Sequence, residues 1–237
     1  MGRNLLAVGL AVTVLSVGSA AFAQQLPPSP PPPPASGGGA IEFGGRLGFG
    51  VPLGREGRIA MDTTSDNLGD DLSAVLPLWL DLGYRINPNI YVGAFFQYAF
   101  GFINSDQNPQ CSQMGTSCSA SNIRLGVNVH YHISPGQPFD PWFGLGVGYD
   151  WLLVGVSMPG LNADVTDRGF EFANLQLGGD FMVSPTFRCG PFVSFSLGEY
   201  RSIKVSAGGT STSMGLSDKG LHEWLLFGFK GAFDIGI

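Results

Sequence analysis

Charge is the scarcest feature of this sequence. Its 237 residues include 12 Lys or Arg and 18 Asp or Glu, so 13% are charged, whereas about a quarter is usual in soluble globular proteins. The net charge is −6 and the basic residues form no cluster, which argues against nucleic acid as a partner. A folded chain with so little charge is expected to have a surface that does not face water everywhere.

Long hydrophobic runs are also missing beyond the N-terminal segment, so no transmembrane helix is expected there. Residues 1–23 are predicted to be a signal peptide, because Arg3 precedes an apolar stretch that ends in Ala-Phe-Ala at Ala23. Cleavage is then expected between Ala23 and Gln24. An uncleaved membrane anchor is the alternative, but the apolar stretch is shorter than the ~20 residues that a spanning helix needs.

Glycine and proline, in contrast, are abundant, with 36 and 17 residues. The 18 Phe, 6 Tyr and 4 Trp exclude a disordered chain, and the glycines lack the three-residue period of collagen. A run of prolines followed by a triple glycine predicts that residues 24–40 are a periplasmic linker, semi-rigid at first and then flexible. We interpret this segment as a passive spacer, with partner docking as the alternative.

From residue 41 to the end of the chain, apolar and polar residues alternate. In the first such segment Ile41 and Phe43 share one face, and Glu42 and Arg46 share the other. A period of two predicts β-strands, and these segments are longer than the usual strand of about five or six residues. The eight predicted strands are 41–51, 75–86, 91–102, 122–133, 142–151, 172–183, 187–198 and 221–237.

The links between these strands alternate in length. Tight turns on one side and long loops on the other are typical of outer-membrane β-barrels. The sequence therefore predicts an all-β, eight-stranded antiparallel up-and-down transmembrane β-barrel over residues 41–237, with both termini in the periplasm of a Gram-negative bacterium. Short links are expected at 87–89, 134–141 and 184–186, and long loops at 52–74, 103–121, 152–171 and 199–220.

A soluble lipocalin-like barrel and a β-sandwich are the alternative folds. Most glycines within the strands lie on the polar face, and an eight-stranded barrel has an interior just wide enough for side chains. The glycine-rich face is therefore expected to point inward, and the bulky face, which carries residues such as Phe96 and Phe229, to point into lipid. A soluble barrel would carry many charges on that outer face.

Charged residues of both signs gather on the inward face. Because buried charges persist only when they are paired, we expect an ion-pair network that plugs the lumen. A catalytic role for these carboxylates is the weaker alternative, because a balanced network needs no substrate to explain it. The expected network comprises Glu42, Arg46, Asp81, Arg85, Arg124, Asp150, Asp180, Arg188, Lys230 and Asp234, with the pairs Arg46–Asp81, Arg124–Asp150 and Asp180–Arg188.

The architecture resembles the small outer-membrane barrels of the OmpA and OmpX type. The resemblance covers residues 41–237 and includes an alternating last strand, although that strand ends in Ile237 rather than in an aromatic residue. It implies two partners, outer-membrane lipids and the barrel-assembly machinery that reads the last strand. The alternating residues of that strand are Leu225, Phe227, Phe229, Phe233, Ile235 and Ile237.

The three cysteines are expected to have different roles. Cys111 and Cys118 lie seven positions apart in the second long loop, and in an exported protein a disulfide between them is expected. A metal site there is not expected, since the loop has no His. Cys189 is predicted to be an unpaired residue on an outward face.

The histidines give only weak functional signals. His130 and His132 share an inward face, and we interpret them as lumen residues rather than a metal clip, because no third ligand is evident. A base role for His222 beside Ser211 or Ser213 is the weaker alternative, because no fixed spacing nominates such a pair. No cofactor is expected.

Two of the long loops have a distinct composition. The first is acidic, and we interpret it as a solvated loop, with divalent-cation binding as the alternative. The fourth is rich in Ser, Thr and Gly and is expected to be mobile. The acidic residues of the first loop are Glu56, Asp62, Asp66, Asp70 and Asp71.

Three functions remain open at the sequence level. The favoured one is a non-enzymatic outer-membrane scaffold whose surface-exposed loops have an envelope-structural or binding role. The alternatives are a small pore, which the narrow and charge-filled lumen disfavours, and a lipid-modifying enzyme. The sequence does not identify the ligand of the extracellular loops.

Overall fold

The computed structural model describes residues 39–57, 67–217 and 219–236. The predicted signal peptide, and the predicted linker up to residue 38, lie outside the described residues. The strands are β1 (Ala40–Gly54), β2 (Leu72–Asn87), β3 (Ile90–Ile103), β4 (Ser117–His132), β5 (Phe139–Met158), β6 (Leu161–Ser184), β7 (Phe187–Ala207), β8 (Thr210–Gly215) and β9 (Leu221–Gly236). The helical turns are α1 (Leu68–Asp71) and η1 (Pro109–Ser112).

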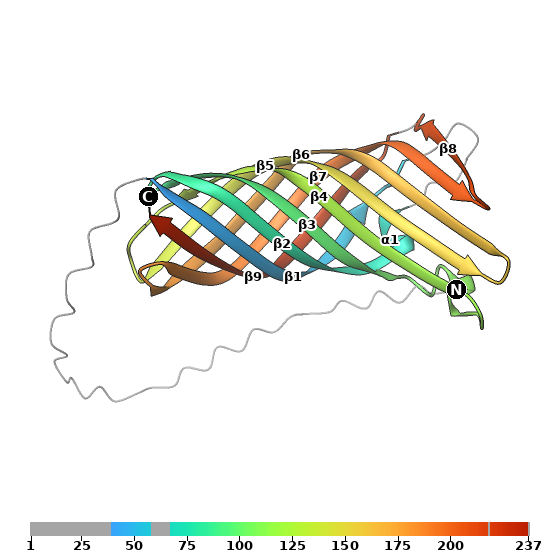
Figure 1. Ribbon diagram of the computed structural model, residues 1–237, viewed down its shortest axis with the longest axis horizontal. Helices are drawn as coiled ribbons and strands as arrows, with labels where there is room; N and C mark the ends of the chain where they lie inside the picture. Colours follow the sequence, from blue (N-terminus) through green and yellow to red (C-terminus); the bar gives the residue numbers. More distant parts are fainter. Residues whose placement is uncertain (1–38, 58–66, 218, 237) are drawn as a thin grey trace, which may run out of the picture. The chain divides into compact units, whose positions relative to one another are not determined.

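Eight of these strands form a closed antiparallel ring (Figure 1). Neighbours along the chain pair from β1 to β7, β7 pairs with β9, and β9 pairs with β1. Strand β8 lies outside the ring and pairs with β7 alone among the described strands. The predicted fold class, an eight-stranded antiparallel up-and-down barrel, is confirmed.

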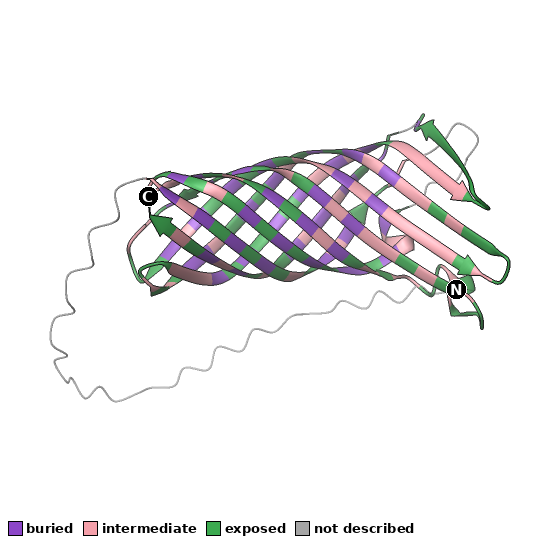
Figure 2. Ribbon diagram, in the orientation of Figure 1, coloured by how far each residue is buried: buried purple, intermediate pink, exposed green. Residues whose placement is uncertain are grey.

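The inner and outer faces of the barrel wall differ as predicted, with bulky apolar side chains exposed on the outside. Along each strand, buried and exposed residues alternate, which gives the barrel the chequered pattern of Figure 2. Leu80 and Phe229 are 63% and 69% exposed on the outside, whereas Trp79 and Phe95 are 1% exposed inside. So many exposed apolar side chains suit lipid rather than water. The outward assignment of the bulky face is confirmed.

One end of the barrel has short turns, and we call it the short-turn end. It holds the links β2–β3, β4–β5 and β6–β7, together with the start of β1 and the end of β9 (Figure 1). The opposite end, which we call the loop end, holds α1, η1 and β8. No helix among the described residues has both the length and the apolar character needed to cross a membrane.

The prediction of a long loop over residues 152–171 is wrong. Strands β5 and β6 continue through this segment and meet at a turn of two residues, Pro159 and Gly160. The backbone ladder runs from Met158 opposite Leu161 down into the barrel. Above the lipid-facing belt both faces of a strand meet water, so the contrast between faces that marks a strand in sequence is lost.

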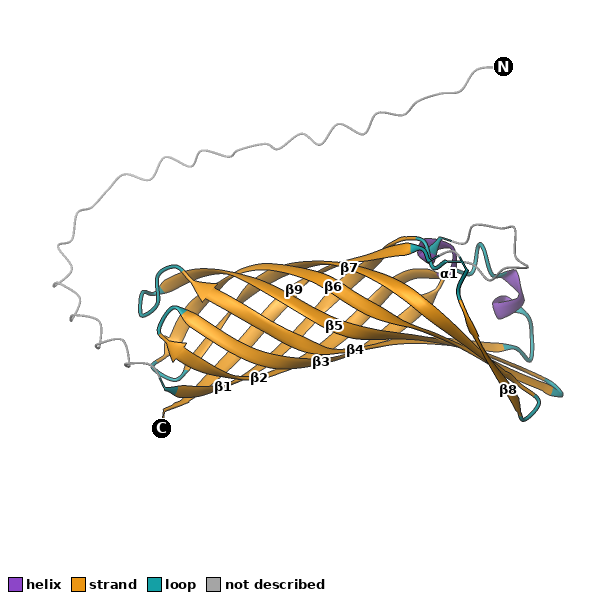
Figure 3. Ribbon diagram, turned by 90° about the horizontal axis from the view of Figure 1, so that it is seen from above, coloured by secondary structure: helices purple, strands orange, loops and turns teal. Residues whose placement is uncertain are grey.

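The prediction of a long loop over residues 199–220 is also wrong over most of its length. Strand β7 continues to Ala207, and β8 returns beside it as the second strand of a hairpin. Gly208 and Gly209 have φ values of 57° and 83°, which is the backbone that a tight two-residue hairpin turn requires. With the extended β5 and β6, this hairpin forms a sheet that projects beyond the loop end (Figure 3).

Two glycines test the inference that the inside is crowded and the outside is not. A Cβ on Gly126 would lie 2.7 Å from the ring of Phe95, whereas a Cβ on Gly45 would meet nothing within 4 Å. We expect Gly126→Val to lower the free energy of unfolding by about 1–3 kcal/mol, because overpacking strains its neighbours. Gly45→Val is the matched control and should be near neutral. Urea titration in lipid vesicles measures both, and equal losses would contradict the assignment of faces.

Candidate functional site

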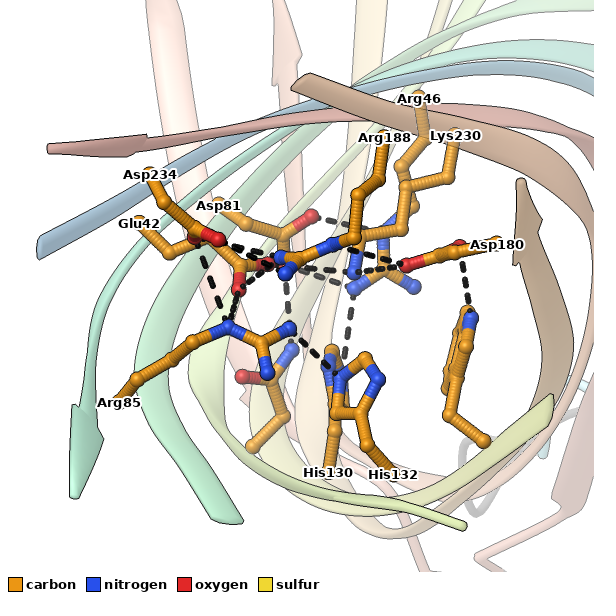
Figure 4. Close-up of polar contacts among 12 residues, drawn as sticks. Glu42, Arg46, Asp81, Arg85, His130, His132, Asp180, Arg188, Lys230 and Asp234 are labelled. Atoms are coloured by element: carbon orange, nitrogen blue, oxygen red, sulfur yellow. Dashed lines mark hydrogen bonds and ion pairs between the residues drawn. The ribbon is translucent and has the colours of Figure 1, made fainter. Parts of the chain in front are cut away.

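The lumen near the short-turn end is filled by an ion-pair network centred on Glu42. Its carboxylate accepts hydrogen bonds from Arg85 and Arg188, each at 2.9 Å, and lies 3.2 Å from Lys230 Nζ. Arg188 also donates to Asp234 at 2.7 Å. The side chains come from β1, β2, β7 and β9 and converge on the lumen (Figure 4). One fully buried carboxylate thus joins three cations from three different strands.

The same network extends to the opposite wall through Asp180. This carboxylate accepts a hydrogen bond from the indole of Trp142 at 2.9 Å and lies 3.8 Å from both Arg188 and Lys230. The structure therefore brings Asp180 and Arg188 together, as expected from the sequence. His132 links Arg85 to Asp140, which lies in the β4–β5 hairpin. Asp140 is not among the network residues expected from the sequence, because the sequence pattern predicts a link between strands at this position.

A second layer crosses the middle of the lumen around Arg46. Its guanidinium forms a two-pronged ion pair with Asp81, at 2.7 and 2.8 Å, and donates to Gln176 at 2.7 Å. The cation lies 4.4 Å from the ring centre of Trp79 and 5.4 Å from that of Phe192. Charge and aromatic rings therefore fill the cross-section together. The expected Arg46–Asp81 pair is present, and both side chains are fully buried.

The third expected pair, Arg124 and Asp150, is brought together by the strands but forms no ion pair among the described contacts. The two residues face each other across β4 and β5, but Arg124 forms its ion pair with Glu171 of β6 and donates a hydrogen bond to the amide oxygen of Gln97. Arg124 is long enough to cross the narrow lumen, so position in the ladder does not fix its partner.

Asp150 is held by neutral donors and one histidine. The amide of Asn122 donates to one carboxylate oxygen, and the indole of Trp224 lies 3.3 Å from the other. His222 Nε2 lies 3.2 Å from that second oxygen, and its ring stacks on Tyr200 with centroids 3.9 Å apart. His222 is therefore buried in a structural cluster. Ser211 and Ser213, its expected alternative partners, lie on the exposed β8.

The lumen near the loop end carries an excess of acid. Asp150, Asp167 and Glu171 are all buried there, with Arg124 as the buried arginine among them. From Phe170 toward the loop end, the outward residues of β6 are polar, namely Arg168, Thr166 and Asp164. Asp167 therefore lies on the loop-end side of the lipid-facing belt. Burial and the nearby carboxylates of Asp71 and Asp150 raise the pKa of Asp167 to about 7. The charge balance expected from the sequence thus fails at both ends, because Asp140 adds a fourth carboxylate to the three cations at the short-turn end, and three carboxylates surround Arg124 at the loop end.

A small lid closes the loop end. In α1, Leu68 is fully buried and packs into the core cluster that includes Leu72, Trp224 and Leu226. The backbone carbonyl of Gly69 accepts a hydrogen bond from Asn104, and that of Asp70 from Asn108, at 3.0 Å each. The second loop therefore holds α1 over the mouth of the barrel.

The predicted disulfide lies in this second loop. Cys111, which lies in η1, forms a disulfide with Cys118 near the start of β4. It closes the segment that follows the two asparagines and ties it to the wall. Cys189 is unpaired and half-buried on the outward face of β7. Among the described residues, no group of three His, Cys, Asp or Glu side chains is arranged to hold a metal ion.

The projecting sheet is the most exposed part of the loop end. All six residues of β8 are exposed, and their register with β7 runs from Ser202 opposite Gly215 to Ala207 opposite Thr210. Within the described residues, the second edge of β8 has no strand beside it. Its sequence, Thr-Ser-Thr-Ser-Met-Gly, contains neither charge nor proline, the devices that usually protect an edge from pairing.

Comparison with solved structures supports the same fold. The crystal structure of Neisserial surface protein A matches with a TM-score of 0.50 and 12% identity, over 83% of this chain and 99% of that one. The outer membrane protein AlkL matches at 0.49 and 13%, over 85% and 92%. The outer membrane protease OmpT from Escherichia coli matches at 0.47 and 7%, over 83% and 97%. No protein-family model and no curated protein matches the chain. At 12% identity, the likeness to Neisserial surface protein A shows the fold alone.

The Arg46–Asp81 pair gives a direct test of the lumen network. We expect Arg46→Met to lower the free energy of unfolding by about 3–5 kcal/mol, because it leaves the carboxylate of Asp81 buried without its cation. Adding Asp81→Asn should recover most of that loss, since the unpaired charge is then removed as well. Urea titration of the two single variants and the double variant in lipid vesicles provides the cycle. Additive losses would mean that the two groups do not interact.

Proposed function

We propose that this chain is a non-enzymatic outer-membrane protein whose closed barrel presents a projecting sheet to an extracellular protein partner. The partner adds an extended segment to the free edge of β8. The observation that carries the proposal is this unprotected edge, which lies at the loop end on strands anchored in the barrel wall. A scaffold role, rather than catalysis, agrees with His222 being engaged with Asp150 and Tyr200 inside the lumen.

An outer-membrane location is supported by the surface and the fold. Large apolar side chains cover the outside of the barrel, as lipid contact requires. Tight turns occupy one end and the disulfide-containing loop, α1 and β8 occupy the other. In outer-membrane barrels the short turns face the periplasm and the larger segments face the cell exterior. On this basis β8 is directed outward from a Gram-negative cell.

The edge of β8 has the chemistry that strand addition needs. In a two-residue hairpin, Ala207 and Thr210 flank the turn as a hydrogen-bonded pair, and hydrogen-bonded and free positions then alternate along the strand. The N–H groups of Ser211 and Ser213 therefore point away from β7. An added segment pairs with these groups through its own backbone, so it gains affinity without a dedicated pocket.

This pairing is tested by removing one backbone donor. Ser213→Pro deletes an outward N–H without removing a bond to β7, whereas Ser213→Ala alters the side chain and keeps the donor. The probe is a fluorescent peptide of alternating Thr and Val, added to the protein in detergent micelles. Fluorescence anisotropy should show about tenfold weaker binding to Ser213→Pro, and unchanged binding to Ser213→Ala. Equal binding to both variants would refute strand addition.

A closed lumen separates this function from that of a pore. In planar bilayers we expect the wild-type protein to show no steady single-channel conductance, because Arg46 and its aromatic neighbours fill the cross-section. Replacing Arg46 and Trp142 together by Ala removes side chains from that layer and should produce openings. Leu80→Ala, on the lipid-facing side, is the control. Large, steady conductance of the wild type would establish a pore instead.

A further inference from the structure

A cluster of aromatic rings stands on the outside of β5 and β6 at the upper limit of the apolar belt. The rings of Tyr149 and Trp151 lie 4.6 Å apart, and those of Tyr149 and Phe170 lie 5.0 Å apart. Trp and Tyr concentrate at the two interfaces of a membrane with water. This cluster therefore marks the height at which the lipid headgroups of the outer leaflet meet the barrel.

Two arginines lie at this same height. Arg168 is opposite Trp151 in the β5–β6 ladder and shares the face of Phe170, two residues further along β6. Arg201 of β7 lies over Phe170, with its guanidinium carbon 5.0 Å from the ring centre and its side chain 55% exposed. The two cations thus approach one aromatic cluster from adjoining strands.

The local charge at these arginines is positive although the chain is acidic overall. Arg201 and Lys219 share one carboxylate, Glu199, at 3.3 and 3.6 Å. Within the described residues, Arg168 forms no ion pair, and its Nε atom is buried without a hydrogen-bond partner. Lys204, opposite Thr166, and Glu223, opposite Leu197, lie on the same outward surface. Among these described residues, four cations and two carboxylates therefore leave an attraction for an anion beside the membrane surface.

An apolar groove of about 600 Å³ runs beneath Arg201 and beside the strand that carries Arg168. Its walls are outward side chains of β4, β5 and β6. Gly126 and Gly148, which are paired in the β4–β5 ladder, line it between these side chains. Arg201 and Phe170 line its upper part. The groove lies within the lipid-facing belt, where hydrocarbon chains are the surrounding solvent. Its apolar walls are Leu125, Val127, Val147, Tyr149, Phe170 and Phe172.

We propose that this surface binds a phosphorylated lipid of the outer leaflet, with the phosphate on Arg168 and Arg201 and an acyl chain in the groove. Guanidinium groups match phosphate oxygens with paired hydrogen bonds, and Arg168 has no carboxylate partner among the described residues. The cations lie at the loop-end side of the apolar groove, just as a lipid headgroup lies at the water-facing side of its acyl chains. The assignment to the outer leaflet rests on the proposed membrane location, but the lipid preference itself is measured in vitro.

The test uses the position of the tryptophans. Trp79, Trp142 and Trp224 are buried in the lumen, which leaves Trp151 of the four as the one beside the proposed site. Phosphatidic acid with brominated chains, a phosphomonoester lipid, should quench this outward tryptophan more effectively than brominated phosphatidylcholine. We expect a preference of about tenfold for the wild-type protein in vesicles at low salt.

Variants separate the site from general surface charge. Arg168→Gln with Arg201→Gln should abolish the preference for phosphatidic acid. Arg55→Gln with Arg58→Gln removes the same number of charges from the segment that follows β1 and should retain it. Val127→Phe fills the groove and should weaken quenching by both lipids while the preference remains. The proposal is overturned if the arginine variant keeps the preference, or if the control variant loses it equally. Because vesicles contain no cell envelope, neither result depends on the proposed location or on strand addition to β8.

Discussion

The narrow interior of a closed ring of eight strands is the constraint on which the rest of this structure depends. Such a ring leaves room inside for side chains and for little else. Gly126 has no side chain at the point where the ring of Phe95 lies. Arg46, a long side chain, is accommodated because aromatic rings cover its guanidinium and Asp81 neutralises it. The outside has no comparable limit, so bulky apolar residues occupy it.

Burial of charge follows from the same constraint. Strands that alternate place half of their residues inward, and in this chain that face carries charged residues of both signs. At the short-turn end the cost of burying Glu42 is offset by three cations that reach it from three strands. At the loop end Asp150 is stabilised instead by donors such as Asn122 and Trp224. Both arrangements place charged side chains in the lumen, and the excess of carboxylates is larger at the loop end.

The sequence predicts the ring, its two faces and the pairing of neighbours, because all three depend on alternation. Arg46 and Asp81 lie on adjacent strands and only two positions apart in the ladder, so their pairing is visible in sequence. Partners across the lumen are not visible in the same way. Glu42 reaches Arg188 past the intervening β9, and Arg124 reaches Glu171 past β5. These choices depend on side-chain length and on the curvature of the wall, which no one-dimensional pattern records.

The segments beyond the membrane escape sequence analysis for a different reason. Once a strand leaves lipid, its two faces no longer differ in polarity, and strand and loop become alike in composition. The only local signs of the projecting sheet are its two hairpin turns, Pro159–Gly160 and Gly208–Gly209. Each turn occupies two residues within a stretch of about 20 that otherwise has the composition of a loop. The register, and not the composition, shows that β5, β6 and β7 continue.

The point at which the sheet leaves the barrel is set by one extra residue in β7. Gly169 pairs with Tyr200 while Arg168 pairs with Ser202, so Arg201 has no counterpart on β6. Such a bulge bends its strand and redirects the side chains around it. Below this bulge β7 pairs with β9, up to Glu199 opposite Leu221, and above it β7 pairs with β8. The same residue therefore releases β7 from the ring and carries a guanidinium over Phe170 at the membrane boundary. A lipid bound by Arg201 would contact the bulge at which β7 leaves the ring. The proposed lipid site and the proposed binding edge on β8 therefore both depend on this bulge.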